Sequence, residues 1–343
     1  MTKKIITAAC PILVGLAVAF MPMVAAFQSK PSKTYGQSVH YQVVHGWPIV
    51  PDNTLLDEVS AVGVDSHGNV FVLMRGGRKW PDTGELDKSR IPVSTVYLFD
   101  GTTGKLLTKW GERLFALPHG LTVDAEDNVW ITDVALQQVF KFSHDGRLQL
   151  TVGETGVAGN DSFHFNQPSG VAVLPNGSFY VSDGYINSRI TKFSADGKFL
   201  LSWGTKGKAD GQFDLPHSVA IDHLLNVYVV DRANKRIQVF DGNGNFLRKF
   251  VGPPFILPQD IKIAADGTMF MTETGNEDLP DRSGVLVLRR DGTQIGRIGS
   301  FGNYDGQFED PHWIAIGKNG EIYVADFTGR RVQKFVLSRR RDR

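Results

Sequence analysis

The sequence predicts an all-β protein, a six-bladed β-propeller in which four-stranded sheets surround a central axis. Three observations predict it. A pattern of apolar residues recurs in about six copies of roughly 40 to 55 residues, each copy contains four short alternating runs, and polar turns such as Asn-Gly and Asp-Gly join the runs. The copies begin at Ser60, His119, Ser169, His217, Gln259 and His312.

The third copy illustrates how each strand is recognised. A first apolar run, 169–174, leads into the turn Pro175-Asn-Gly, and a second run follows at 179–182. A third run covers 189–193, and the turn at Asp196-Gly introduces a fourth. Such short strands joined by tight turns are typical of antiparallel meanders rather than β-α-β units. Outside the N-terminus no segment has a helical period, so the alternative is an open β-sandwich with accidental similarity.

The propeller is expected to span residues 41–338 as one domain. The last copy has only three clear strands of its own and ends near Leu337. We expect the run from Tyr41 to Val44 to add the missing strand, because closing the ring removes an exposed sheet edge.

The N-terminus is expected to be a secretory signal peptide, residues 1–26. Lys3 and Lys4 precede an apolar stretch from Ile5 that ends in Val24-Ala-Ala, a small-residue cleavage pattern. Residues 27–40 would form an N-terminal extension of an exported, periplasmic or secreted protein. An uncleaved membrane anchor is the alternative, and only then would the protein contact a membrane.

Composition excludes some partners. The 37 basic and 36 acidic side chains nearly balance, which disfavours nucleic-acid binding. The basic tail at 339–343 is expected to be solvated. The only cysteine, Cys10, lies in the signal segment, so the mature domain has no disulfide. We expect a monomer that acts on a small-molecule or peptide-derived substrate.

Three Pro-His pairs occupy the same position in every second copy: His119, His217 and His312 each follow a proline. One such pair is most simply an ordinary turn histidine. Three in six equivalent positions, from 9 histidines in 343 residues, exceed chance. Since the first strand of a blade lines the channel, the three imidazoles would converge at intervals of about 120°. Three neutral imidazoles with an open fourth position are typical of a catalytic zinc site.

The residues that follow the second strands should lie on the same face, because first and second strands are antiparallel. They include Arg75 and Arg232, with Tyr185 one position further along in its blade. An arginine beside a metal can clamp a substrate carboxylate, and a phenol near a dication and arginines can act as a base. The alternative is that the arginines pair with structural aspartates and the tyrosine simply packs.

A second series of residues, at the ends of the second strands, is interpreted as structural. Each carboxylate in it is expected to cap turn amides. The series is Asp133, Asp183, Asp231 and Asp326.

The chain resembles the peptidyl-α-hydroxyglycine α-amidating lyases, six-bladed propellers of NHL-type repeats. The resemblance runs from about Val59 to Phe335 and is carried by Leu117-Pro-His-Gly-Leu-Thr-Val-Asp, Val129-Trp-Ile-Thr-Asp-Val-Ala-Leu, Val181-Ser-Asp-Gly-Tyr-Ile-Asn-Ser-Arg and Gly211-Gln-Phe-Asp-Leu-Pro-His-Ser.

The resemblance implies zinc at His119, His217 and His312, with Tyr185, Arg75 and Arg232 as catalytic residues. The implied reaction is a carbon–nitrogen lyase reaction that splits an α-hydroxyglycine-type substrate, which carries a carboxylate, into an amide and glyoxylate.

The resemblance also implies a structural calcium. Its ligands would be the main-chain oxygens of Val62 and Leu121 together with an aspartate after the third histidine. Trp313 stands at that last position in this chain.

Two other classes of function fit the repeats. One is a noncatalytic NHL-repeat propeller for ligand or protein binding. The other is a metal-dependent propeller hydrolase such as a calcium lactonase, which is disfavoured because the six channel positions hold no Asp or Glu.

Overall fold

The computed structural model describes residues 40–51, 56–251, 255–275, 278–279 and 282–338. Contacts divide the chain into two units, Met1–Tyr35 and Gly36–Arg343. The expected signal peptide, most of the extension and the basic tail lie outside the described residues. Within the described part of the chain there is no α-helix, and thus no helix long and apolar enough to cross a membrane.

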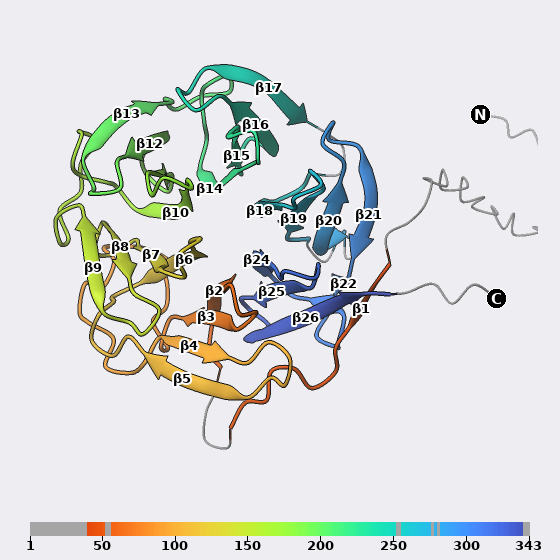
Figure 1. Cartoon of the computed structure of the whole chain (residues 1–343). Helices are drawn as coiled ribbons and strands as arrows, with labels where there is room; N and C mark the ends of the chain where they lie inside the picture. The colour runs from red at the N-terminus through yellow and green to blue at the C-terminus, as the bar shows by residue number, and fades with distance from the viewer. Residues whose placement is uncertain (1–39, 52–55, 252–254, 276–277, 280–281, 339–343) are drawn as a thin grey trace, which may run out of the picture. The chain divides into compact units, whose positions relative to one another are not determined.

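Six four-stranded antiparallel sheets form the predicted six-bladed propeller (Figure 1). The first blade consists of β2 (Val59–Val64), β3 (Val70–Met74), β4 (Val96–Phe99) and β5 (Leu106–Trp110). The second consists of β6 (Pro118–Val123), β7 (Val129–Asp133), β8 (Gln138–Phe142) and β9 (Leu148–Val152). The third consists of β10 (Pro168–Val173), β11 (Phe179–Asp183), β12 (Arg189–Phe193) and β13 (Phe199–Trp203).

The other three blades repeat this order. The fourth consists of β14 (Pro216–Ile221), β15 (Val227–Asp231), β16 (Arg236–Phe240) and β17 (Phe246–Val251). The fifth consists of β18 (Pro258–Ile263), β19 (Met269–Glu273), β20 (Gly284–Leu288) and β21 (Gln294–Ile298). The sixth consists of β24 (Pro311–Ile316), β25 (Ile322–Asp326), β26 (Arg331–Leu337) and β1 (Tyr41–Val43), and a short parallel pair, β22 (Ser300–Phe301) and β23 (Gln307–Phe308), precedes it.

The ring closes as expected. Strand β1 pairs antiparallel with β26, with Tyr41 opposite Leu337 and Val43 opposite Phe335. The first strand of the propeller in the sequence is therefore the outermost strand of the last blade (Figure 1). This pairing covers the edge of β26.

A β-bulge at the start of each innermost strand places one residue toward the axis. In the fourth blade Pro216 pairs with Asp231, but the next paired residue is Ser218, which faces Val230. His217 between them has no partner in the ladder, and a bulge of this kind redirects a side chain. The same register shift occurs at His119 and His312, so the fold itself sets the direction of all three imidazoles.

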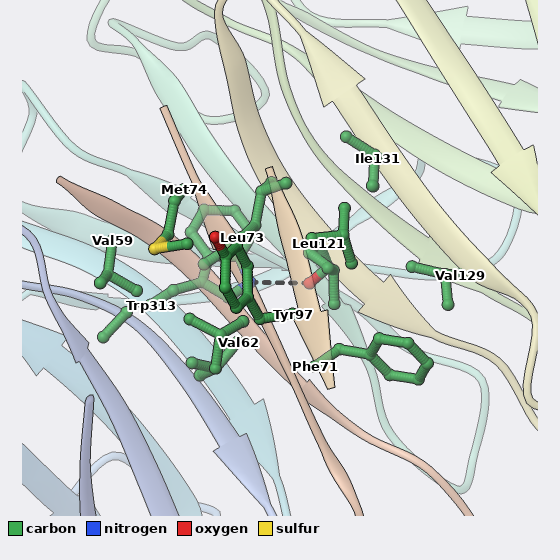
Figure 2. Packing of buried hydrophobic residues seen from close by; sticks show 14 of the residues in the cluster. Val59, Val62, Phe71, Leu73, Met74, Tyr97, Leu121, Val129, Ile131 and Trp313 are labelled. Carbon is green, nitrogen blue, oxygen red and sulfur yellow. Dashed lines mark hydrogen bonds between the residues drawn. The ribbon is translucent and has the colours of Figure 1, made fainter. Parts of the chain in front are cut away.

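Trp313 is buried in the interior of the ring, one residue after the third histidine. Its side chain is 1% exposed and packs in the hydrophobic cluster that includes Val62 and Leu73 (Figure 2). Glycine at positions 120 and 170 leaves room for the indole, because a Cβ atom at either position would lie 3.1 Å from its Cη2 atom. Trp313 therefore belongs to the core.

Candidate metal centre and active site

The three histidines converge as the repeat predicts. Their ring centroids lie 4.8 to 5.0 Å apart in all three pairings, with the rings nearly perpendicular to one another. The possible ligand atoms of His119, His217 and His312 all lie within 4.8 Å of one another, and the side chains are buried. The structure therefore contains a three-histidine group that a metal ion could share.

Carbonyl groups of the three blades that carry no Pro-His pair fix which nitrogen of each imidazole faces the axis. The Nδ1 atom of His119 lies 2.7 Å from the carbonyl oxygen of Ser169. His217 Nδ1 lies 2.8 Å from the carbonyl of Gln259, and His312 Nδ1 lies 2.6 Å from that of Ser60. A carbonyl only accepts, so each Nδ1 carries the proton and each Nε2 keeps a free lone pair.

Two of these lone pairs compete for one proton. The Tyr185 hydroxyl lies 2.8 Å from Nε2 of His119 and 3.0 Å from Nε2 of His217. The hydroxyl can donate to only one of them, so the other contact brings two lone pairs together in a buried site. A metal cation would remove this conflict. The donor set therefore fits a metal held by three Nε2 atoms, whose Nδ1 protons the carbonyl groups hold in place.

Burial keeps the three imidazoles neutral. It is the main cause that lowers the pKa of His119 and of His217 well below the usual value. Burial also lowers the pKa of His312 to about 4, against the opposing charge of Asp310. Neutral imidazoles bind metals, so protons compete weakly with a metal ion for these nitrogens.

Arg75 lies beside this group as predicted, and its charge is poorly compensated. The guanidinium carbon lies 4.5 Å from the ring centre of Phe327 and 5.8 Å from that of Trp80. Its nearest ion-pair partner, Glu58, is 3.9 Å away, and its buried Nε has no hydrogen-bond partner. Burial lowers its pKa, while Tyr185 and Glu58 oppose that shift. A buried arginine whose ion-pair partner is this distant can receive an anionic ligand.

Arg232 approaches the same phenol. The charge of its guanidinium group acts on the Tyr185 hydroxyl, and its buried Nε also has no partner. Burial raises the pKa of Tyr185, and Arg232 and Arg75 oppose that shift without overcoming it. The two arginines alone therefore do not produce a phenolate, and any base function of Tyr185 depends on a dication as well.

The structural aspartates have other partners than these arginines. Asp231 binds Arg236 at 2.6 Å, and Asp183 binds Arg189 at 2.9 Å. Asp133 accepts backbone N–H groups, including those of residues 116 and 117. The interpretation of this series as structural is confirmed. The alternative in which Arg75 and Arg232 are held by these aspartates is not supported.

Two side chains near the site were not predicted from the sequence. Trp80 packs on Tyr185, with ring centroids 4.6 Å apart. Asp310 contributes a carboxylate whose charge acts on both Arg75 and Tyr185, and the Thr274 hydroxyl donates to it at 2.6 Å. The sequence contains a signal for Asp310, because the first two Pro-His pairs follow leucine and the third follows this aspartate.

The predicted calcium site does not fit this chain. The Leu121 carbonyl, one of its expected ligands, accepts the indole N–H of Trp313 at 3.0 Å (Figure 2). Asp260, the buried carboxylate at this level of the channel, binds the ammonium of Lys262 at 2.8 Å. That ammonium also lies 5.2 Å from the Trp313 ring centre. A fixed cation and an N–H donor thus take up these oxygens, and we derive no role for calcium.

A cleft of about 630 Å³ adjoins the site. Tyr185 lines it together with the first-blade loop that follows Arg75, including Trp80 and Leu86, and with Ile186. The loop that follows Arg75 therefore borders the site, and the cleft gives the Tyr185 ring an accessible side.

The comparisons with known proteins agree with the repeat. The NHL repeat model matches residues 165–193 and 213–240. The chain is 35% identical to peptidyl-alpha-hydroxyglycine alpha-amidating lyase 1 of Drosophila melanogaster, over 86% of this chain and 60% of that protein. It is 32% identical to lyase 2 of the same fly, over 86% of this chain and 75% of that one. Human NHL repeat-containing protein 3 is 30% identical, over 88% of this chain and 85% of that protein.

Among solved structures, virginiamycin B lyase from Staphylococcus aureus has a TM-score of 0.54 and 16% identity, covering 86% of this chain and 84% of that one. This likeness concerns the fold alone. The chain spans less than two thirds of the first of the curated relatives, and three quarters of the second fly lyase. Because the chain is 32% identical to the second fly lyase over three quarters of that protein, it belongs to the peptidyl-α-hydroxyglycine α-amidating lyase family.

Proposed function

We propose that this protein is a zinc-dependent carbon–nitrogen lyase that splits an N-acyl-α-hydroxyglycine into an amide and glyoxylate. The observation that carries the proposal is the contact of one phenol, Tyr185, with the free Nε2 atoms of two histidines of the three-histidine group. Two arginines whose buried Nε atoms have no hydrogen-bond partner act on that phenol with their charge. The family of the chain supports the same reaction.

His119, His217 and His312 would hold the zinc. When bound, zinc would act as a Lewis acid that lowers the pKa of the substrate hydroxyl and of the neighbouring phenol. Neutral imidazoles with an open position suit this ion. The carbonyl groups that accept their Nδ1 protons keep the rings oriented without any help from the substrate.

Arg75 would bind the substrate carboxylate. It is the buried cation whose nearest acidic partner is 3.9 Å away, so a ligand carboxylate can come closer than Glu58 does. Arg232 would stabilise the phenolate form of Tyr185, since its charge already opposes the rise in the pKa of that phenol. Both roles use the charge of a guanidinium group, which keeps its proton at any working pH.

Tyr185 would accept the proton of the α-hydroxyl group. The electron pair of the O–H bond then forms the carbonyl of glyoxylate, while the C–N bond breaks and its electron pair goes to the amide nitrogen. The nitrogen needs one proton and Tyr185 has received one, so the step balances without a redox partner. Charge that develops on the leaving nitrogen stays close to a proton donor.

The test is glyoxylate release from α-hydroxyhippuric acid. We expect wild-type protein to produce glyoxylate and Tyr185→Phe to lower the rate by about 10²- to 10⁴-fold, the usual contribution of a general base. The Phe variant should retain its metal, since the three histidines remain. A matched control is Tyr304→Phe, which removes a hydroxyl from an exposed tyrosine outside the cleft. Metal-loaded wild-type protein that releases no glyoxylate would refute the proposal.

A further inference from the structure

The cleft beside Tyr185 has an aromatic wall formed by Trp80. The indole of Trp80 contacts the Tyr185 ring at 4.6 Å between centroids and lies 5.8 Å from the guanidinium carbon of Arg75. Trp80 is half-buried and its loop, 80–88, lines the outer part of the cleft. Trp80 thus lies between the carboxylate-binding end of the site and the open cleft.

Several contacts hold this loop in place. Arg78 forms an ion pair with Asp87 inside the loop. The ammonium of Lys88 donates to the carbonyl of Gly156 in the next blade at 3.0 Å. Ile91 N–H donates to the carbonyl of Phe115 at 2.8 Å. Because the loop is held at its base and by a contact with a second blade, it presents the indole in a fixed orientation. Less conformational entropy of the loop is then lost when a ligand binds.

Aliphatic side chains line the same cleft as Trp80. Ile186, the residue after Tyr185, is 59% exposed and lines the cleft, and Leu86 from the loop adds a second aliphatic side chain. An exposed isoleucine and a half-buried tryptophan that line one cleft provide apolar surface that a ligand could cover. Polar side chains line the cleft as well, among them Asp82, Glu85, Gln137 and Gln167.

The inference that follows rests on the proposed function. Suppose that Arg75 holds the carboxylate of the bound substrate and that the three histidines face its hydroxyl. The third substituent of the α-carbon, the acylated nitrogen, then has to point out of the site, past Tyr185. The cleft is the space that Tyr185 and Trp80 both border. The acyl group would therefore reach the indole.

We propose that Trp80 is a specificity-determining residue that binds the acyl group of the substrate. Its ring surface and the side chain of Ile186 would enclose a flat or bulky apolar group on the carbonyl carbon next to the amide nitrogen. The preferred substrates would then be N-aroyl-α-hydroxyglycines, or peptides with a large apolar residue before the hydroxyglycine, rather than those with small acyl groups. An aromatic contact of this type accounts for a preference of roughly 2- to 12-fold.

The experiment compares N-benzoyl- and N-acetyl-α-hydroxyglycine as substrates of wild type, Trp80→Ala and Trp80→Phe. We expect wild type to prefer the benzoyl substrate in kcat/KM, chiefly through KM. Trp80→Ala should bring the ratio close to one, and Trp80→Phe should restore most of it. Tyr304→Ala, which removes an exposed aromatic ring outside the cleft, should leave the ratio unchanged.

A binding measurement separates this inference from the proposed function. Calorimetry with N-benzoylglycine and N-acetylglycine, which lack the reacting hydroxyl, should give the same preference and the same loss in Trp80→Ala. If wild type binds both analogues but releases no glyoxylate, the lyase proposal fails and the binding ratio still tests Trp80. Trp80→Ala could instead lower kcat for both substrates equally and leave unchanged both the benzoyl-to-acetyl ratio in kcat/KM and the same ratio in binding. Trp80 would then only hold Tyr185 in position, and the inference is overturned.

Discussion

Replacing Arg75 with methionine should separate catalysis from stability. Arg75 is fully surrounded by protein, yet its nearest carboxylate oxygen is 3.9 Å away and its Nε has no partner. Its burial is therefore poorly compensated. We expect Arg75→Met to leave the free energy of unfolding unchanged within about 1 kcal/mol or to raise it, because the loss of a weak pair is offset by relief of desolvation.

The catalytic effect should be large and specific for the substrate carboxylate. A hydrogen bond to a charged group is worth about 1.5–3 kcal/mol, so losing one such bond lowers kcat/KM by about 10- to 150-fold. The effect should disappear when the carboxylate of α-hydroxyhippuric acid is replaced by a neutral amide. Both substrates are measured by release of the acylated amide product, and unfolding is measured in urea.

Arg236→Met is the matched control for the stability part. Arg236 is equally buried, but it binds Asp231 at 2.6 Å and donates to the carbonyl groups of residues 208, 209 and 212. Removing it leaves the buried Asp231 carboxylate without its cationic partner, which typically costs about 3–5 kcal/mol. If Arg75→Met were destabilised as strongly as Arg236→Met and kept its selectivity for the carboxylate substrate, Arg75 would be a structural residue and the reasoning would be wrong.

Two further predictions concern the channel. Because Trp313 stands where an aspartate ligand was expected, its N–H occupies the Leu121 carbonyl, and Lys262 neutralises the buried Asp260, adding millimolar calcium or EGTA should not change the melting temperature; a calcium-dependent rise of several degrees would show that the ion binds after all. In metal-free protein, the folded pKa of His312 is about 4 while the unfolded value is about 6.5, so the unfolded state binds more protons in this window and stability falls as pH drops through it. As pH falls from about 6.5 to about 4, the unfolding free energy of wild type minus that of His312→Gln should decrease by about 1.4 kcal/mol per pH unit. A difference independent of pH would contradict the neutral buried imidazole.

The sequence was sufficient for the features that repeat. Six copies of one strand pattern predict the blades, and the position of each Pro-His pair predicts which face and which radius the imidazoles occupy. Arg75, Arg232 and Tyr185 were found because antiparallel strands bring the end of one and the start of the next to the same face. In a repeat fold, equivalent positions in the sequence copies occupy equivalent places in the blades, so their relative positions in space can be inferred from the sequence.

Features without a repeat were not predictable in this way. Trp80 lies on a first-blade loop whose length and sequence are not part of the repeat, so spacing gives no information about its contact with Tyr185. The carbonyl groups of Ser60, Ser169 and Gln259 orient the histidines, but a backbone atom has no signature in the sequence. The balance of burial and charge at Tyr185 also depends on the packed structure, because burial outweighs two nearby arginines there.

The most direct test of the central claim is the metal content of the purified protein, measured by elemental analysis. The account predicts about one zinc per chain in wild type and its loss in His217→Ala, while His144→Ala, a change at a histidine outside the three-histidine group, should retain it. Folding of each variant is checked by its urea transition. A folded wild-type protein that binds no zinc even after incubation with the ion, or a folded His217→Ala variant that binds it as well as wild type, would contradict the account.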